Sequence, residues 1–373
     1  MTRPILYVAI TAHGFGHATR AAALVDTLQR LRPDLLPILV TTAPRWLLGS
    51  YISGEFLYRP RALDVGVVQQ DSLQIDRQTT LEQLQALRSR AAAIVAAEVD
   101  FIRQMSVKNG RVALVLADLP PLAIDIAQAA GLPCWAVGNF GWDFIYRDWG
   151  GEFEQEADWI ADRFRRCDRL FRLPFHEPMA SFPQQTDVGL TGGTPRYGAA
   201  ELRDKLGLPD IPRDRTVLLT FGGLGLQQIP YERLRQFPDW LFITFDRSAP
   251  DLPNLYQVLD PIEHHASDRP FRPVDFMPLC GRIVSKPGYG TFAEACRTGP
   301  TVATLTRDGF AEAPILLDQI QAQTSHQILQ PTEFFEGDWS FLQAAPTPSQ
   351  PGQRFTLDGN ETIAQAISAV LET

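Results

Sequence analysis

The sequence predicts an α/β protein with two domains, each built around a parallel β-sheet. Short apolar strands alternate with helical patterns along most of the chain, and strands joined by crossover helices form parallel sheets. Glycine-rich turns follow strands in both halves. The chain has 373 residues, of which 45% are hydrophobic and 21% charged. A single core rarely grows beyond roughly 250 to 300 residues, so we expect two cores.

The N-terminal strand and turn are the strongest local signal. The apolar run at residues 5–11 predicts a buried strand, and HGFGHATR at residues 13–20 follows it directly. Gly14 and Gly16 permit a tight turn, after which a helix is expected from about residue 17 to 32. The first N–H groups of that helix would line a polar pocket, which is the usual setting for an anion.

The rest of the first domain repeats the alternation. After a strand at 37–43 come a short helix at 44–52 and a long amphipathic helix at 81–104, then strands at 111–118 and 134–138. Asp118 ends a strand, at the edge where open α/β sheets place ligands and where His17 also lies. We place the first domain at residues 1–180 and a Pro- and Gly-rich linker at 181–195.

Residues 139–149 read as a loop that is dense in aromatic and polar groups. Such loops often form the wall of a site, and Asn139, Trp142 and Asp143 are candidates for contact with a substrate. The alternative is that Phe140, Trp142 and Phe144 seal the core. The pattern leaves both open.

The second domain is predicted at residues 196–355. Helices are expected at 200–208 and 231–237, strands at 216–220 and 240–245, and a strand, turn, helix and strand at 282–307; a closing helix occupies 356–373. The pattern predicts two Rossmann-like halves that face one another across a cleft. The segment from 246 to 273 shows no clear pattern.

Two glycine turns in this domain differ in strength. GGLG at 222–225 is a short cluster without an immediate helix, whereas KPGYGTFAEA at 286–295 opens a helix. Thr291 and Glu294 have the spacing of a capping box, which is one interpretation. The other is that the helix N-terminus binds a diphosphate and Glu294 accepts hydrogen bonds from two ribose hydroxyls.

Composition excludes several classes of partner. The net charge of −9 and the pI near 5.2 argue against nucleic-acid binding and give no support for binding an anionic membrane surface. Four dispersed cysteines show no metal or disulfide spacing: Cys134, Cys167, Cys280 and Cys296. No signal peptide or 18-residue apolar span is evident, so we expect a cytoplasmic protein in a reducing compartment.

These motifs resemble those of a known family. HGFGHATR, FGGLG at 221–225 and the segment at 275–307 are similar to GT-B-fold glycosyltransferases, especially the family-28 group. Residues 118–133 and 139–146 look closer still to the glycosyltransferase-like N-terminal part of plant L-arabinokinases. The likeness covers about residues 1 to 330, and no kinase half follows.

The resemblance implies an inverting, metal-independent transfer of a sugar from a nucleotide-diphosphate donor, such as a UDP-sugar, to a hydroxyl acceptor, without a cofactor. In this family the histidine of the first turn is the general base, which maps onto His17 with Asp118 as its partner, and His13 is the alternative base. The acceptor side would comprise His13, Gly14, Gly16, Asn139, Trp142 and Asp143.

On the donor side, the resemblance puts Glu294 on the ribose and Phe276 with Met277 beside the base. Asp308 and Glu312 would hold the donor sugar. Lys286 and the two glycine turns would surround the diphosphate, although Lys286 could also be merely solvated. The turn residues concerned are Gly222, Gly223, Gly288, Tyr289, Gly290 and Thr291. Two other functions stay open, a nucleotide-sugar 2-epimerase and a noncatalytic nucleotide-sugar-binding regulatory protein.

Overall fold

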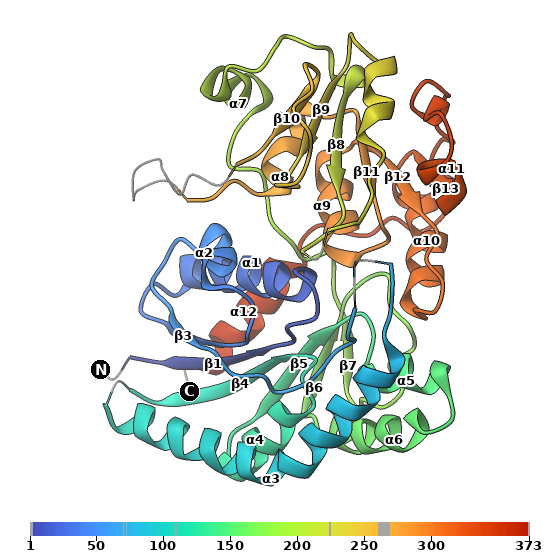
Figure 1. Ribbon diagram of the computed structural model, residues 1–373. Helices are drawn as coiled ribbons and strands as arrows, with labels where there is room; N and C mark the ends of the chain where they lie inside the picture. Colours follow the sequence, from blue (N-terminus) through green and yellow to red (C-terminus); the bar gives the residue numbers. More distant parts are fainter. Residues whose placement is uncertain are drawn as a thin grey trace.

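Two parallel sheets form two lobes, one above the other in Figure 1. The computed structural model describes residues 3–69, 71, 73–108, 110–223, 225–259 and 269–371. The first sheet has seven strands in the order β3-β2-β1-β4-β5-β6-β7, and the second has six in the order β10-β9-β8-β11-β12-β13. All strand pairs within the two sheets are parallel. The predicted α/β class with two Rossmann-like domains is confirmed.

The first domain is built from an alternation of strands and helices. Its elements are β1 (Ile5–Ile10), α1 (Gly16–Leu31), β2 (Leu36–Val40), α2 (Arg45–Tyr51), β3 (Leu57–Arg59), α3 (Arg77–Lys108), β4 (Val112–Asp118), α4 (Leu122–Ala130), β5 (Cys134–Gly138), α5 (Trp142–Trp149), α6 (Phe153–Phe164), β6 (Arg169–Arg172) and β7 (Gln185–Asp187).

The second domain repeats the pattern with shorter helices. Its elements are α7 (Ala199–Leu206), η1 (Arg213–Arg215), β8 (Thr216–Thr220), η2 (Tyr231–Gln236), β9 (Leu241–Thr244), β10 (Leu255–Gln257), α8 (Pro273–Phe276), η3 (Met277–Leu279), β11 (Arg282–Ser285), α9 (Tyr289–Thr298), β12 (Thr301–Leu305), α10 (Glu312–Gln323), β13 (His326–Leu329), α11 (Pro331–Phe335), η4 (Ser340–Leu342) and α12 (Gly359–Leu371).

Several segments differ from the expectations. The supposed loop at 139–149 is mostly helix α5, because Trp142, Ile145 and Tyr146 bury one helical face in the core. Strand β7 lies inside the expected linker and extends the first sheet through its pairing with β6. Residues 231–236 form a 3-10 helix rather than an α-helix. The unpatterned segment contains β10, and its residues 260–268 lie outside the described chain.

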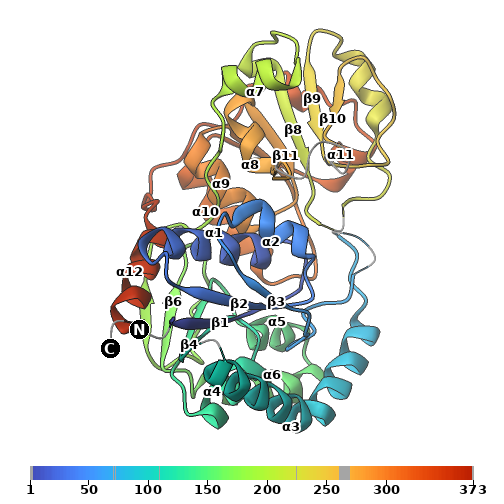
Figure 2. The ribbon, with the colours of Figure 1, turned by 90° about the vertical axis from the view of Figure 1, so that its left-hand side faces the viewer.

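The closing helix α12 returns to the first domain. Figures 1 and 2 both show it beside α1, within the lobe of the first domain. Its apolar residues Ile363, Ala364 and Ile367 are buried in the core cluster that includes Leu24 and Leu28 of α1. The chain therefore crosses between the domains twice.

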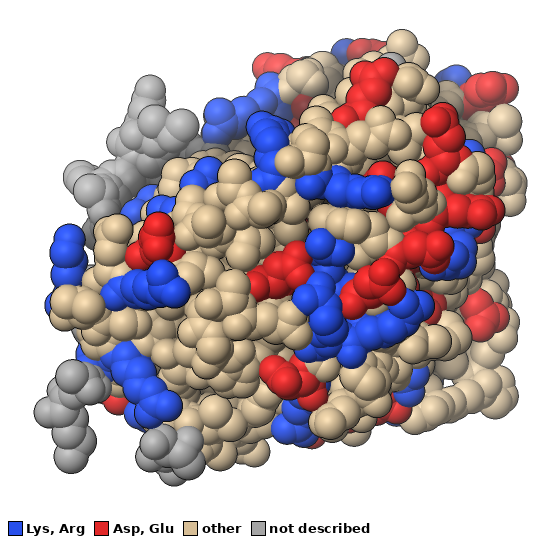
Figure 3. All heavy atoms as spheres, turned by 90° about the horizontal axis from the view of Figure 1, so that it is seen from below, with Lys and Arg blue, Asp and Glu red and all other residues tan. Residues whose placement is uncertain are grey.

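The outer face formed around α3, α4 and α6 carries charges of both signs, as Figure 3 shows from below. Ion pairs account for part of this pattern, because Asp125 binds both Arg163 and Arg166. Among the described residues, no helix combines the length and apolar character needed to cross a bilayer. The four cysteines are free thiols.

Candidate active site

The candidate site is a cleft where the carboxyl edges of the two sheets face each other. The strand order reverses between β1 and β4 in the first sheet and between β8 and β11 in the second. Such switch points are where open α/β sheets bind ligands. The cleft has a volume of about 510 Å³ and is lined by both turns predicted to matter, residues 13–17 and 286–291.

Two helix N-termini meet at the cleft. Helix α1 begins at Gly16, and helix α9 begins after its N-cap Gly288. A Cβ placed on Gly290 would lie only 3.8 Å from Cα of Gly16, so the two starts are close neighbours. Gly14 has a φ of +63°, which a residue with a side chain rarely adopts, and this turn directs the chain into α1. Both helix dipoles thus present their positive ends to the cleft.

His17 and Asp118 form a buried pair. The Nδ1 atom of His17 lies 2.7 Å from Oδ1 of Asp118. Nη2 of Arg20 also lies 3.0 Å from this Nδ1. The shorter contact is to the carboxylate, which only accepts, so it favours the neutral imidazole with its proton on Nδ1 and its lone pair on Nε2. Burial and the charge of Arg20 lower the pKa of His17, while Asp118 opposes them. The imidazole is therefore neutral near pH 7 and lines the cleft.

Arg20 is a functional candidate that the sequence analysis missed. Its guanidinium donates to both carboxylate oxygens of Asp118, at 2.8 and 2.6 Å, and to Oδ1 of Asn139 at 2.8 Å. Burial alone would raise the pKa of Asp118, yet Arg20 and His17 together lower it. Arg20 lies three residues after His17 on the same helix, so the sequence alone indicates that the two side chains share one helical face.

Asn139 connects the two domains rather than facing the cleft. Its amide donates to Oε1 of Glu312, at the start of α10, over 2.7 Å. Since Asn139 also accepts from Arg20, one buried chain of hydrogen bonds runs from Asp118 to the second domain. Its position differs from the expected acceptor contact, because it is fully buried and does not line the cleft.

His13 lines the cleft next to His17 but is held differently. Its Nδ1 lies 3.1 Å from the carbonyl oxygen of Val67. Its ring stacks on Phe310 of the second domain, with centroids 5.8 Å apart. Burial and the positive charges around it hold the pKa of His13 well below its usual value. It lacks the carboxylate partner that His17 has.

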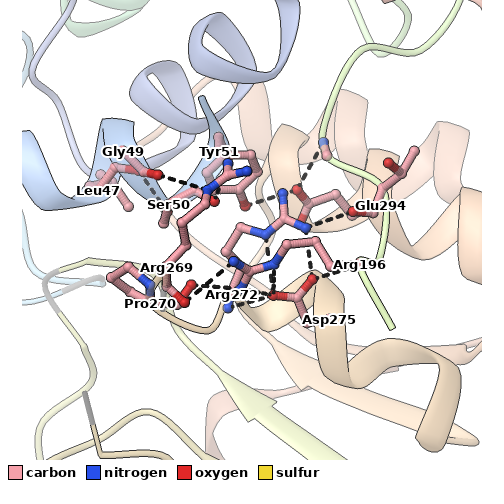
Figure 4. A network of polar contacts seen from close by, with 12 residues as sticks. Leu47, Gly49, Ser50, Tyr51, Arg196, Arg269, Pro270, Arg272, Asp275 and Glu294 are labelled. Carbon is pink, nitrogen blue, oxygen red and sulfur yellow. Dashed lines mark hydrogen bonds and ion pairs between the residues drawn. The ribbon is translucent and has the colours of Figure 1, made fainter. Parts of the chain in front are cut away.

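Glu294 projects from α9 toward the first domain, as Figure 4 shows. Its Oε1 accepts hydrogen bonds from the hydroxyl of Tyr51 at 3.0 Å and the backbone N–H of Gly193 at 3.1 Å. It does not close a capping box with Thr291, because the helix begins earlier, at Tyr289. Burial raises the pKa of Glu294 to about 7, against the effect of Arg272.

The same network ties α2 to the second domain. Arg269 donates to the carbonyl oxygens of Gly49 and Ser50 at 3.1 and 2.9 Å. Beside it, Asp275 binds both Arg196 and Arg272, and Arg272 lies over the Tyr51 ring at 4.7 Å. The side chain of Glu294 is thus positioned by both domains.

Comparisons with known proteins fit this architecture. No protein-family model matches the chain. An L-arabinokinase of Arabidopsis thaliana is 28% identical over 368 residues, which are 96% of this chain and 33% of that protein. The chain therefore spans about a third of the length of this curated relative.

Solved structures match along the whole chain. A UDP-glucosyltransferase from Polygonum tinctorium superposes with a TM-score of 0.60 at 14% identity, over 100% of this chain and 99% of that one. The calicheamicin glycosyltransferase CalG4 gives 0.61 at 14% identity, over 100% and 98%. Medicago truncatula UGT71G1, complexed with UDP-glucose, gives 0.60 at 13% identity, over 98% of each chain. The chain has the GT-B fold.

The GT-B cleft contains most of the residues predicted on the donor side. Residues from both glycine turns, together with Glu294 and Glu312, line it: Gly222, Gly223, Lys286, Gly288, Tyr289, Gly290 and Thr291. Leu224 of the GGLG turn lies outside the described residues. Tyr289 is anchored, because its hydroxyl lies 3.0 Å from Oγ1 of Thr191.

Besides Asp118 and Asn139, five other predicted site residues do not line the GT-B cleft. Phe276 and Met277 are fully buried, and Phe276 supports the cleft-lining rings of Phe245 and Phe271 through edge contacts. Trp142 is also in the core, where its Nε1 donates to Asp64 at 3.1 Å. Asp143 instead accepts from Ser181, and Asp308 is exposed outside the cleft.

Burial decides these differences, because spacing does not reveal which face of an element packs inward. Of the aromatic segment at 139–146, Phe140 lines the cleft, so the core-sealing interpretation describes most of it. Among the described residues, no group of three or more His, Cys, Asp or Glu could hold a metal ion.

Proposed function

We propose that the chain is a glycosyltransferase that moves a sugar from a nucleotide-diphosphate donor, such as a UDP-sugar, to a hydroxyl acceptor, with inversion and without a metal. The observation that carries this proposal is the buried His17–Asp118 pair, 2.7 Å apart, at the switch point of a GT-B cleft. It sits close to the N-terminus of α9, which is a ready site for a diphosphate.

In the proposed reaction, His17 acts as general base. Its Nε2 takes the proton of the acceptor hydroxyl as the oxygen attacks the anomeric carbon, from the face opposite the diphosphate. The bond from the anomeric carbon to the diphosphate oxygen breaks, and the electron pair leaves with the nucleotide diphosphate. Asp118 stabilises the imidazolium that forms, and Arg20 fixes the carboxylate in place.

The donor is assigned to the second domain. The N–H groups at the start of α9 and the side chain of Lys286 would stabilise the leaving diphosphate, which is the role a metal plays elsewhere. Glu294 would accept hydrogen bonds from the ribose through Oε2, since Oε1 already has two donors. What the similar structures bind, such as UDP-glucose in UGT71G1, supports a UDP-sugar as donor.

The test is release of nucleotide from a panel of UDP-, GDP- and dTDP-sugars, with and without a cell-extract acceptor fraction and with EDTA. We expect acceptor-dependent release that EDTA leaves unchanged. The variant His17→Ala should lower kcat/KM at least about a hundredfold, the usual range for a lost general base, while binding of UDP stays within about twofold. Thr42→Ala, at an exposed position of the first domain, is the control.

The outcomes separate the candidate functions. A loss below about tenfold in His17→Ala, or under 1.4 kcal/mol, would contradict the assignment of the base. Isomerised donor in the absence of any acceptor would favour the 2-epimerase. Binding of a UDP-sugar without turnover under any condition would favour a regulatory protein.

A further inference from the structure

Two cationic side chains of the cleft form no ion pair with any described residue. Lys286 directly follows β11, and Arg307 comes two residues after the neighbouring strand β12, so both leave the same edge of the second sheet. Both line the cleft. Within the described part of the chain neither forms an ion pair, and Nε and Nη2 of Arg307 have no hydrogen-bond partner although the residue is only 7% exposed.

This arrangement is costly for the protein alone. A buried donor without a partner loses its hydration and gains nothing in return. Two other buried arginines are matched by carboxylates, Arg20 by Asp118 and Arg272 by Asp275, whereas the buried Arg282 donates to backbone carbonyl oxygens. Burial lowers the pKa of Lys286 to about 7 and that of Arg307 to about 10, and Glu312 opposes both shifts. The charge of Asp71 also raises the pKa of Arg307, yet Nε and Nη2 of Arg307 have no hydrogen-bond partner among the described residues, so the pair is suited to an anionic ligand.

Ring contacts place Arg307 on the side of the cleft where the reaction would occur. Its guanidinium lies over Phe310 at 4.2 Å. The Phe310 ring meets Phe140 at 6.0 Å, and Phe140 meets His17 at 5.7 Å. Because Phe310 covers the flat face of the guanidinium, the N–H groups at its edge remain for a ligand, and this planar fork matches a carboxylate.

We propose that Arg307, assisted by Lys286, binds a carboxylate on the sugar ring of the donor, so that the transferred sugar is a uronic acid. The proposal rests on the proposed function, in which the sugar lies between the α9 turn and His17. The diphosphate is assigned to the N-terminus of α9, and Arg307 follows the neighbouring strand β12 and lies over Phe310, whose ring stacks on His13.

The experiment is calorimetric titration of the full chain with UDP, UDP-glucose and UDP-glucuronate. We expect the wild type to bind UDP-glucuronate at least about tenfold more tightly than UDP-glucose. Arg307→Gln should abolish that preference and leave the Kd of UDP within about twofold. Arg307→Lys, which keeps the charge but loses the fork, should retain only part of it. Arg235→Gln, at an exposed arginine of the same domain, is the matched control.

Three results would overturn the proposal. Equal affinity of the wild type for both sugar nucleotides would remove the carboxylate subsite. An equal loss of UDP binding in Arg307→Gln would assign Arg307 to the diphosphate. A preference that appears only when free glucuronate rather than glucose is titrated into the UDP complex would assign the carboxylate to the acceptor.

Failure of the proposed function would look different: the wild type would not bind UDP, would isomerise the donor without an acceptor, or would bind a UDP-sugar without turnover, whichever sugar it prefers. Turnover of UDP-glucose with rejection of UDP-glucuronate would overturn the uronic acid assignment and leave the glycosyltransferase standing.

Discussion

When His17 accepts a proton, the imidazolium lies beside the carboxylate of Asp118, which also forms an ion pair with Arg20. Asp118 accepts hydrogen bonds from both side chains within the same buried space. Burial lowers the pKa of His17, the positive charge of Arg20 lowers it further, and Asp118 raises it. At a fixed degree of burial, the basicity of His17 depends on the balance between these two neighbours.

Replacing Arg20 should shift that balance. In Arg20→Gln the negative charge of Asp118 is no longer neutralised, so the pKa of His17 should rise. Because the base works when it is neutral, the acid limb of the kcat/KM profile should move to higher pH than in the wild type. Breaking the buried ion pair should also lower the free energy of unfolding by about 3 kcal/mol.

A pH–rate profile and urea unfolding measure the two effects. Arg30→Gln, at the exposed end of the same helix, should change neither. An acid limb that stays in place while turnover falls would mean that Arg20 acts only through packing.

Binding of UDP should be strongest near pH 7, because two side chains of the cleft titrate there. Glu294, whose pKa is raised to about 7, becomes protonated as pH falls and then accepts more weakly from the ribose. Lys286, whose pKa is lowered to about 7, loses its charge as pH rises and then attracts the diphosphate less. Affinity should decline on both sides.

Calorimetry between pH 5.5 and 8.5, taken as roughly one and a half units around these values, can separate the limbs. Glu294→Gln should flatten the acid limb of the pH dependence of UDP affinity, and Lys286→Met should flatten its alkaline limb. The titration of UDP itself contributes equally in all variants. An unchanged profile in Glu294→Gln would contradict contact between Glu294 and the ribose.

Sequence reasoning proposed His17, Asp118 and Glu294 as site residues because each ends a strand or lies near the start of a helix at an edge where ligands are expected. It did not assign a role to Arg20 or Arg307, which lie within the motifs used for the resemblance. Their roles depend on what they face across the fold: Asp118 lies 98 residues from Arg20. Phe276 and Asp143 were misplaced for the opposite reason, since their surroundings bury them away from the cleft.

At the scale of elements, the first glycine turn contacts the second domain directly. The ring of Phe15 lies so close to Gly223 that a Cβ there would overlap it. Gly223 follows β8, and Phe15 precedes α1, so this contact sets how near the two switch points approach. The sequence indicated both turns, but only the folded chain shows that they touch.

The variant Gly223→Ala should therefore hold the cleft more open. We expect a fall in kcat/KM of about tenfold or more, since the base and the donor turn must be correctly placed. The double variant Phe15→Ala/Gly223→Ala removes the overlap and should recover much of the loss. If the double variant is as poor as Gly223→Ala, the overlap with Phe15 is not the cause of the loss.

At the scale of the whole molecule, the two chain crossings between the domains are joined to each other. The N–H of Leu190 donates to the carbonyl oxygen of Thr356 at 2.8 Å, and the Asn360 amide donates to that of Gly192, also at 2.8 Å. Beyond this junction, α12 packs on α1. The closing helix was expected from its apolar periodicity, but its partner was not, because a pattern does not say which surface it covers.

This arrangement makes the first domain depend on the last residues of the chain. Ile367 is fully buried against the core that contains α1, so Ile367→Ala removes apolar contacts and leaves a cavity. We expect the free energy of unfolding to fall by about 2 to 4 kcal/mol in urea titrations followed by circular dichroism. Gln365→Ala, on the exposed face of the same helix, should change it by less than about 0.5 kcal/mol.

Because α1 carries His17, a weakened α12 should also lower turnover before the second domain loses affinity for UDP. Equal losses in both variants would contradict the packing of Ile367 on the core of the first domain as the source of the stability that α12 adds.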